Sequence, residues 1–181
     1  MANELGLEAT EVRLAPHDPE WRTLGRNECD AVQALLGGLA SDVVHVGSTS
    51  VPGIEAKPIL DIVVAVPDRV QIDDVVSRLC AGGVYTYEGD RREDGGLLFV
   101  RGPGPVRTVH VHVVGTGSRA WADYLRFHAI LVADRDARDR YQSEKRRLAE
   151  LFPHDRQSYT FAKRAVVEAL LAAAGPPPHD R

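Results

Sequence analysis

The stretch HVGSTSVPGIEAKPILDI, residues 45–62, indicates both the fold and the functional site of this chain. It overlaps two apolar segments, DVVHVGS and PILDIVVAV, whose Val and Ile content is typical of buried strands. The first segment stops at Gly47-Ser48, and the second carries Asp61. A glycine at a strand end lets a phosphate approach the backbone, a serine adds a hydroxyl, and a nearby aspartate can hold Mg²⁺. We therefore expect a phosphate site here; the alternative is a tight turn whose buried aspartate caps backbone groups.

Two familiar loop motifs do not fit this stretch. A P-loop needs a lysine directly after its second glycine, but Ile54 follows Gly53. A nucleophile elbow needs the pattern GxSxG, but residues 47–51 are GSTSV. The stretch therefore predicts a different arrangement for binding phosphate.

The rest of the chain alternates between helical and strand patterns. Apolar spacing predicts helices within residues 18–39 and 69–83, and turn residues separate strand candidates at 84–89, 96–102 and 107–115. From Ser118 onward the pattern predicts three helices, the last two separated by Pro153. We predict an α/β (α+β) fold in which a small mixed β-sheet is flanked by helices and followed by a C-terminal helical segment. The expected organisation is a single domain over residues 1–181, with a sheet core at about 43–115, C-terminal helices at about 118–174 and a disordered tail at 175–181.

Composition excludes several classes of protein. No apolar run approaches the roughly 20 residues of a membrane span, and the N-terminal segment lacks an export signal, so we expect no membrane partner and a cytoplasmic location. The formal net charge of -4 makes nucleic acid an unlikely main partner. Cys29 and Cys80 lie outside any metal-ligand spacing, which favours two reduced thiols.

Four segments of the sequence resemble the GrpB family over almost the full length of the chain. They are HVGSTSVPGIEAKPILDI, VHVHVV, WADYLRFHAILV and LAELFPHDRQSYTFAK. The resemblance implies a nucleotidyltransferase-like fold, in which a Gly-Ser or Gly-Gly step precedes an acidic pair on a neighbouring strand. The residues that match the phosphate turn of this fold are Gly47, Ser48, Thr49 and Ser50.

The acidic pair of that fold is incomplete here. Nucleotidyl transfer normally uses two divalent ions held by two or three carboxylates. Alternation along the strand places Asp61, Val63 and Ala65 on one face, so Val63 stands where a second carboxylate is expected.

Two histidines on a later strand are candidate substitutes. In RTVHVHVVG the valines face one way, while His110 and His112 share the other face, a recurring spacing of metal ligands. If this strand lies beside that of Asp61, the three side chains converge on one ion. The alternative is that one or both histidines form local hydrogen bonds or contact a phosphate without a metal. Glu88, at the end of VYTYEG, is a further candidate ligand for the ion.

Several basic and aromatic residues are candidates for binding the phosphates of a nucleotide. Lys57 lies four residues before Asp61 and is the first candidate. Tyr159 and Lys163 share one face of the last helix, and Lys145 of the preceding helix can join them, although a solvated helix surface explains Lys145 equally well. His128 is expected to be a partly buried residue with a local partner rather than a ligand.

These residues together favour a nucleotidyltransferase that uses Mg²⁺ or Mn²⁺. It would bind an NTP, with ATP as the first candidate, and transfer an NMP to a small-molecule acceptor. Asp61, His110 and His112 would carry the chemistry. One alternative is a catalytically inactive nucleotide-binding module, and another is a metalloenzyme, such as a hydrolase, that uses the Asp/His/His set. Acceptor, base preference and oligomeric state cannot be predicted from the sequence.

Overall fold

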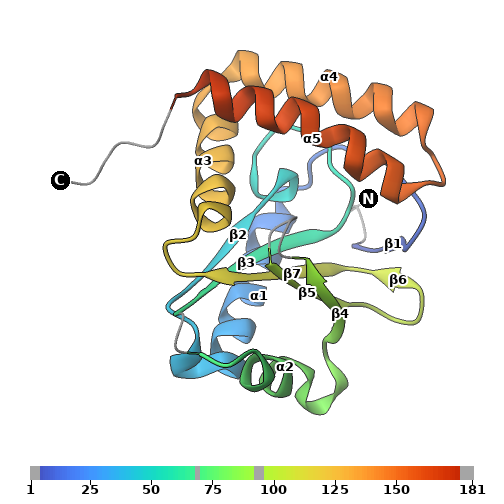
Figure 1. The fold of residues 1–181 in the computed structure, drawn as a ribbon. Coiled ribbons are helices and arrows are strands. Elements are labelled where there is room, and N and C mark those ends of the chain that lie inside the picture. Colours follow the sequence, from blue (N-terminus) through green and yellow to red (C-terminus); the bar gives the residue numbers. More distant parts are fainter. Residues whose placement is uncertain (1–4, 68–69, 92–95, 176–181) are drawn as a thin grey trace.

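The structure is a computed structural model and describes residues 5–67, 70–91 and 96–175. Residues 176–181 of the predicted tail lie outside the described residues. A five-stranded sheet forms the centre, with the strand order β2-β3-β7-β5-β4 (Figure 1). Its strands are β2 (Asp42–Val46), β3 (Leu60–Val66), β4 (Thr86–Arg91), β5 (Gly96–Arg101) and β7 (Val109–Gly115). Strands β3 and β7 pair in parallel and the other neighbours are antiparallel, so the sheet is mixed as predicted.

Helices α1 (Glu20–Leu36) and α2 (Ile72–Cys80) pack on one face of this sheet (Figure 1). The sheet presents alternate strand residues to them, including Val109, Val111 and Val113, which are buried. Trp21 of α1, fully buried, belongs to the same core. The short helical turns η1 (Gly37–Leu39) and η3 (Ala81–Gly83) follow the two helices. Because strand residues alternate between the two faces, the residues between these buried valines face the opposite side of the sheet.

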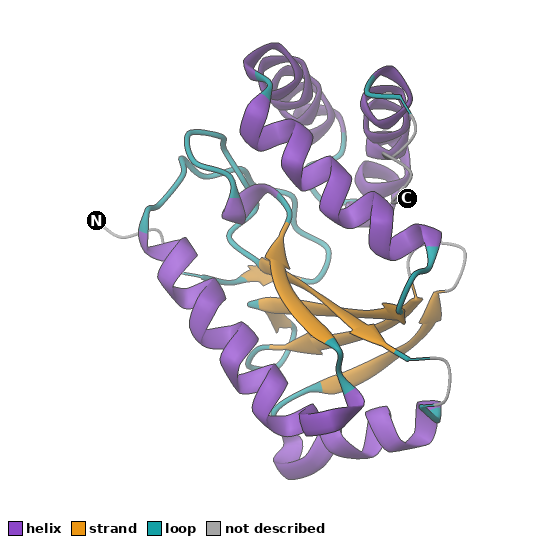
Figure 2. Ribbon diagram, turned by 90° about the vertical axis from the view of Figure 1, so that its left-hand side faces the viewer, coloured by secondary structure: helices purple, strands orange, loops and turns teal. Residues whose placement is uncertain are grey.

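Helices α3 (Arg119–Ala133), α4 (Arg135–Leu151) and α5 (Arg156–Ala173) lie on the opposite side of the sheet (Figure 2). Each begins at a side-chain cap: Ser118, Asp134 and Asp155 accept hydrogen bonds from backbone N–H groups of the first turn. Helix α3 packs on the sheet through Trp121 and Leu125, whereas α4 and α5 pack with it over the loop between β2 and β3. The mixed sheet, its flanking helices and the C-terminal helical segment confirm the predicted fold class.

The N-terminal segment closes one end of the molecule. Strand β1 (Leu7–Glu8) pairs with β6 (Val106–Arg107) in a separate two-stranded sheet. Arg156, at the start of α5, donates to the backbone oxygens of Glu8 and Glu11. These bonds tie the first described residues to the C-terminal helices.

One strand begins later than the sequence predicts. Strand β4 starts at Thr86 rather than at Val84, because Gly82 and Gly83 both adopt positive φ angles and keep the chain in a turn. In the part of the chain that the structure describes, we find no helix both long and apolar enough to cross a membrane.

Candidate functional site

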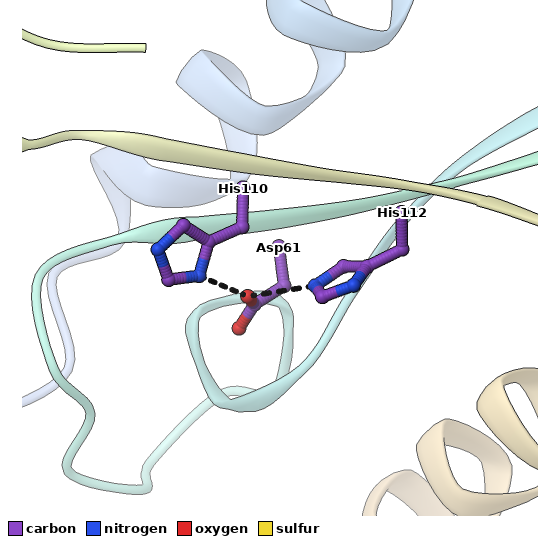
Figure 3. A group of neighbouring side chains, drawn as sticks. All are labelled: Asp61, His110 and His112. Atoms are coloured by element: carbon purple, nitrogen blue, oxygen red, sulfur yellow. Dashed lines mark ion pairs between the residues drawn. The ribbon is translucent and has the colours of Figure 1, made fainter. Parts of the chain in front are cut away.

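Three polar side chains meet on the face of the sheet that α1 and α2 leave open. Asp61 of β3 and His110 of β7 are direct partners in the parallel register, and His112 lies two residues further along β7. Asp61 Oδ1 is 3.3 Å from His110 Nδ1 and 3.6 Å from His112 Nε2 (Figure 3). The pairing of β3 with β7, together with strand alternation, therefore brings the predicted trio together.

The electrostatics of the trio keep the carboxyl group ionised. Burial acts to raise the pKa of Asp61, but the neighbouring imidazoles of His110 and His112 outweigh it and hold the pKa well below its usual range. Burial lowers the pKa of His110 although Asp61 opposes this. The Asp61 side chain is still 35% exposed, so a ligand from solvent can reach its oxygens.

The trio fits a divalent metal ion. One carboxylate oxygen and one nitrogen from each histidine all lie within 4.8 Å of one another. Bonds from a metal to such atoms are roughly 2.0–2.2 Å long, so only small side-chain adjustments would be needed. Magnesium prefers a shell of oxygen atoms, whereas imidazole nitrogen suits transition metals. Of the two ions predicted from the sequence, the donor set therefore suits Mn²⁺ better than Mg²⁺.

The Gly47–Ser50 turn lies against the carboxyl group of Asp61. Gly47 has a φ of 73°, and residues Ser48–Ser50 form the short helical turn η2. A Cβ atom on Gly47 would lie 2.7 Å from Asp61 Oδ2, which is closer than such atoms approach. Position 47 therefore needs glycine for two reasons, its backbone conformation and the space occupied by the aspartate.

Two hydroxyls of this turn are already engaged within the protein. Thr49 is buried, and its Oγ1 lies 3.0 Å from Nε2 of His45. Ser50 Oγ donates to the Gly47 oxygen at 2.7 Å and lies 2.9 Å from Nδ1 of His128. His128 thus has a local partner, as predicted. These bonds hold the turn in shape, and the binding of phosphate by Thr49 and Ser50 stays a prediction.

Lys145 of α4 reaches the same turn from the helical side. Its side chain is buried, and Nζ donates to Ser48 Oγ at 3.0 Å and to the backbone oxygen of Glu55. Nζ also lies 4.7 Å from the ring centroid of Tyr141. Burial and then the nearby Lys163 lower the pKa of Lys145 to about 7. A solvated helix surface is thus the wrong interpretation of Lys145.

Two further lysines gather around the ring of Tyr159. Nζ of Lys57 lies 5.0 Å and Nζ of Lys163 5.7 Å from the ring centroid of this buried tyrosine. Burial, followed by Lys163 and Arg156, lowers the pKa of Lys57 to about 7. Tyr141 raises the pKa of Lys163. The structure therefore brings together all four residues that were predicted to bind phosphates outside the turn.

Sequence reasoning missed how α4 holds the loop between β2 and β3. Glu55 N donates to Gln142 Oε1 at 2.8 Å, and the Glu55 oxygen accepts from Lys145. The Glu55 carboxylate accepts two hydrogen bonds from Arg146, at 2.7 and 3.0 Å. The acidic loop residue and the basic residues of α4 were visible in the sequence, but no spacing rule connects positions about 90 residues apart.

The structure shows where Glu88 lies and what surrounds Val63, the two positions considered for a further carboxylate ligand. Glu88 lies on β4, the edge strand, which β5 and β7 separate from β3, and it pairs with Arg107 at 2.8 Å. The expectation that Glu88 joins the metal ligands is therefore wrong. Val63 is completely buried against α3. The position that would carry a second carboxylate is thus part of an apolar contact.

Comparisons with known proteins agree with this architecture. The family model described as GrpB protein matches residues 11–173. A UPF0157 protein of Streptomyces coelicolor is 44% identical over 171 residues, which cover 94% of this chain and 88% of that protein. The crystal structure of the conserved protein GrpB from Enterococcus faecalis is similar with a TM-score of 0.73 and 28% identity, over 90% of this chain and 99% of that chain.

A more distant likeness concerns the fold alone. A chain in the structure of a GLD-2/RNP-8 complex is similar with a TM-score of 0.51 and 10% identity, over 90% of this chain and 62% of that chain. This likeness supports the nucleotidyltransferase-like fold that the sequence predicted.

Proposed function

The chain belongs to the GrpB family, and from this premise and the geometry of the site we propose that it is a metal-dependent nucleotidyltransferase. It would bind an NTP, with ATP as the first candidate, and transfer the NMP to a small-molecule acceptor. The nucleotidyltransferase-like fold supports such an activity.

One observation carries the proposal: the Gly47–Ser50 turn has the carboxylate of Asp61 on one side and the ammonium group of Lys145 on the other. The Asp61 carboxylate lies beside Gly47, where a Cβ atom would be 2.7 Å from Oδ2, and Ser48 accepts a hydrogen bond from Lys145. A phosphate chain placed on this turn would meet a bound cation at one end and lysine ammonium groups at the other. Triphosphate binding needs charges of this kind on both sides.

The residues have separate roles in this proposal. Asp61, His110 and His112 would hold the divalent ion, for which we expect Mn²⁺ in preference to Mg²⁺. The bound ion would neutralise charge on the phosphate oxygens and favour departure of pyrophosphate. Lys145 would exchange its bond with Ser48 for one with a phosphate oxygen. Lys57 and Lys163 would add positive charge beside the Tyr159 ring.

The transfer itself forms one bond and breaks one. An oxygen of the acceptor, from a hydroxyl, carboxylate or phosphate, would bond to the α-phosphorus of the NTP. The bond from this phosphorus to the bridging oxygen would break, and pyrophosphate would leave. If the acceptor is a hydroxyl, its proton would pass to solvent water. The chain would contribute mainly by positioning the reactants and neutralising charge.

Two other functions each have one observation in their favour. The burial of Val63 leaves the site without a second carboxylate, which favours a nucleotide-binding module without catalysis. The two-histidine, one-carboxylate set favours a metalloenzyme such as a hydrolase. Nucleotide binding without pyrophosphate release over a panel of acceptors would support the first. Stoichiometric Zn or Fe in the purified protein, with no nucleotide binding, would support the second.

Calorimetry with a non-hydrolysable NTP and Mn²⁺ tests the proposal. The wild type should bind, and Asp61→Asn should weaken binding at least about a hundredfold because an ion ligand is lost. Asp42→Asn, at an exposed carboxylate on the neighbouring strand β2, is the matched control and should bind like the wild type. Tight binding without metal that is unchanged in Asp61→Asn would remove the proposal.

A further inference from the structure

A second group of basic side chains lies beside the loop that follows the phosphate turn. A hollow of about 300 Å³ is lined by His17, Pro19, Arg22, Thr23, Arg26 and Pro52. Most of these residues belong to the start of α1 or to the segment just before it, while Pro52 belongs to the loop between β2 and β3. None of them is used in the proposed binding of the NTP.

Neither of the two arginines has an ion-pair or side-chain hydrogen-bond partner among the residues that the structure describes. Arg22 and Arg26 are four residues apart on α1, so they share one helix face and repel each other. Within residues 5–67, 70–91 and 96–175, neither guanidinium forms an ion pair or a side-chain hydrogen bond. No carboxylate lines the hollow. The nearest acidic neighbour in sequence, Asp18, accepts a hydrogen bond from Glu20 N at 2.9 Å.

His17 adds a polar atom that lacks a partner. Its Nδ1 is buried without any hydrogen-bond partner, while the ring packs edge-to-face on Trp21 with centroids 5.7 Å apart. A buried nitrogen left unpaired costs roughly 1–3 kcal/mol. The Thr23 hydroxyl supplies one more group able to bond an oxygen anion.

The hollow lies close to the metal-binding trio. A Cβ atom on Gly25 would lie 2.1 Å from the ring of His45, so this histidine packs directly against the α1 turn that carries the arginines. Val46, the next residue along β2, is the strand partner of Asp61. The α1 turn that carries the arginines and the strand residue Asp61 therefore both neighbour the end of β2.

We propose that this hollow is an anion subsite that binds a phosphate group of the acceptor substrate. Arginine suits this role because its planar guanidinium can donate two parallel hydrogen bonds to phosphate, and two such groups stand on one helix face. The assignment to an acceptor rests on the proposed nucleotidyl transfer, because only that reaction requires a second substrate beside the turn. The acceptor class is thus a small phosphomonoester.

NMR of the full chain can observe this subsite directly through the side-chain Nε–Hε signals of Arg22 and Arg26. Titration with inorganic phosphate and, separately, with glycerol 3-phosphate at constant ionic strength should shift both signals along saturable curves. The phosphomonoester should bind at least as tightly as inorganic phosphate. Arg78, an exposed arginine of α2, is the internal control and should shift only slightly and without saturation.

The double variant Arg22→Gln/Arg26→Gln should lose phosphomonoester binding at least tenfold while its binding of Mn²⁺ and NTP stays within about twofold of the wild type. An unchanged circular dichroism spectrum and melting temperature would show that it folds. The subsite proposal fails if Arg22 and Arg26 shift no more than Arg78, or if the double variant binds the phosphomonoester as well as the wild type. Its assignment to an acceptor fails if inorganic phosphate saturates the signals and glycerol 3-phosphate does not.

The outcomes for the two sites can be told apart. In one outcome, the signals of both arginines shift along saturable curves, and Asp61→Asn binds the NTP as tightly as the wild type. This outcome would support an anion site and overturn the transferase proposal. In the other outcome, Asp61→Asn loses NTP binding and the arginine signals do not respond to phosphate. This outcome would support the transferase proposal and overturn the anion subsite.

Discussion

The two halves of the candidate site are built from different parts of the fold. Asp61, His110 and His112 stand on adjacent strands, and their relative positions follow from the register of β3 and β7. Lys57, Lys145 and Lys163 come from a loop and two helices, and they meet around two tyrosines. The strand half is positioned by a rigid ladder of backbone hydrogen bonds. The helix half is positioned by the packing of α4 and α5 over the loop and by hydrogen bonds from α4 side chains to Ser48 and Glu55.

This difference extends to the charge of each half. The carboxylate of the strand half is stabilised in its ionised form by two histidines. The lysines of the helix half crowd one another, and burial lowers the pKa of Lys57 and Lys145. The strand half is therefore ready for a cation, whereas the helix half carries a positive charge that an anion would relieve. The following predictions test whether the halves differ in this way.

The largest effect is expected from placing the missing carboxylate on the sheet. Val63→Asp should lower the free energy of unfolding by about 3 kcal/mol or more, because an aspartate there would be buried against α3 without a partner. Urea unfolding measures this loss, and Val63→Thr, of similar volume, should lose less. A Val63→Asp protein as stable as the wild type and faster in pyrophosphate release would contradict this account.

A smaller effect is expected from removing the charge of the helix half. Lys145→Met should weaken NTP binding tenfold or more, which corresponds to about 1.4 kcal/mol. The ligand-free protein should not lose stability, because a buried charge is replaced by an apolar chain.

Calorimetry and thermal unfolding measure the two properties of Lys145→Met. Arg147→Met, at an exposed arginine of the same helix that pairs with Glu144, is the control and should leave NTP binding unchanged. Equal NTP affinity in Lys145→Met and the wild type would show that the helix half does not bind phosphate.

The junction between the halves can be tested with a pair of glycines. Gly47 and Gly53 both have positive φ angles, 73° and 81°, but only the Cβ of a residue at position 47 would meet Asp61. Each change to alanine should cost about 1 kcal/mol of backbone strain. Gly47→Ala alone should also weaken Mn²⁺ binding severalfold by displacing the carboxylate. If both variants bind Mn²⁺ equally well, the contact between the turn and Asp61 is unimportant.

The remaining prediction is a dependence of stability on pH. The pKa values of Lys57 and Lys145 are about 7 in the folded chain and 10.5 when unfolded. Between pH 7 and 10.5 the unfolded state therefore binds more protons, so stability rises with pH, by up to about 1.4 kcal/mol per pH unit for each lysine.

Urea unfolding at pH 7.0 and 8.5 measures this slope below the ordinary pKa values of Cys29, 9.0, and Tyr159, 10.0, above which titration of these two groups would lower stability. The wild type should be more stable at pH 8.5, and Lys145→Met should show a smaller increase. Stability that falls over this interval in the wild type would mean that these lysines are not desolvated.

The sequence predicted the strand half of the site well. Two-residue alternation alone placed His110 and His112 together, opposite the buried valines of β7. It could not establish that β7 lies beside β3, because pairing between distant strands depends on the whole fold. The same limit explains Glu88, whose place on an edge strand follows from the strand order and not from its neighbours in sequence.

The helix half was harder to predict for a physical reason. A lysine on an amphipathic helix has the same sequence context whether it is solvated or buried, so Lys145 could be nominated but its bond to Ser48 could not be foreseen. Hydrogen bonds also join Glu55 of the loop to a helix that is distant in sequence. Their partners on α4 are Gln142, Lys145 and Arg146. Such contacts depend on tertiary packing, which local patterns do not encode.

Pulsed electron paramagnetic resonance of the protein with Mn²⁺ and a non-hydrolysable NTP tests the central claim most directly, namely that the two halves bind one metal–nucleotide complex. The same Mn²⁺ signal should show couplings to ¹⁴N from the two imidazoles and to ³¹P from the nucleotide, and the ¹⁴N couplings should weaken when His110 or His112 is replaced by glutamine. A Mn²⁺ signal coupled to ³¹P but without any ¹⁴N coupling would contradict the account.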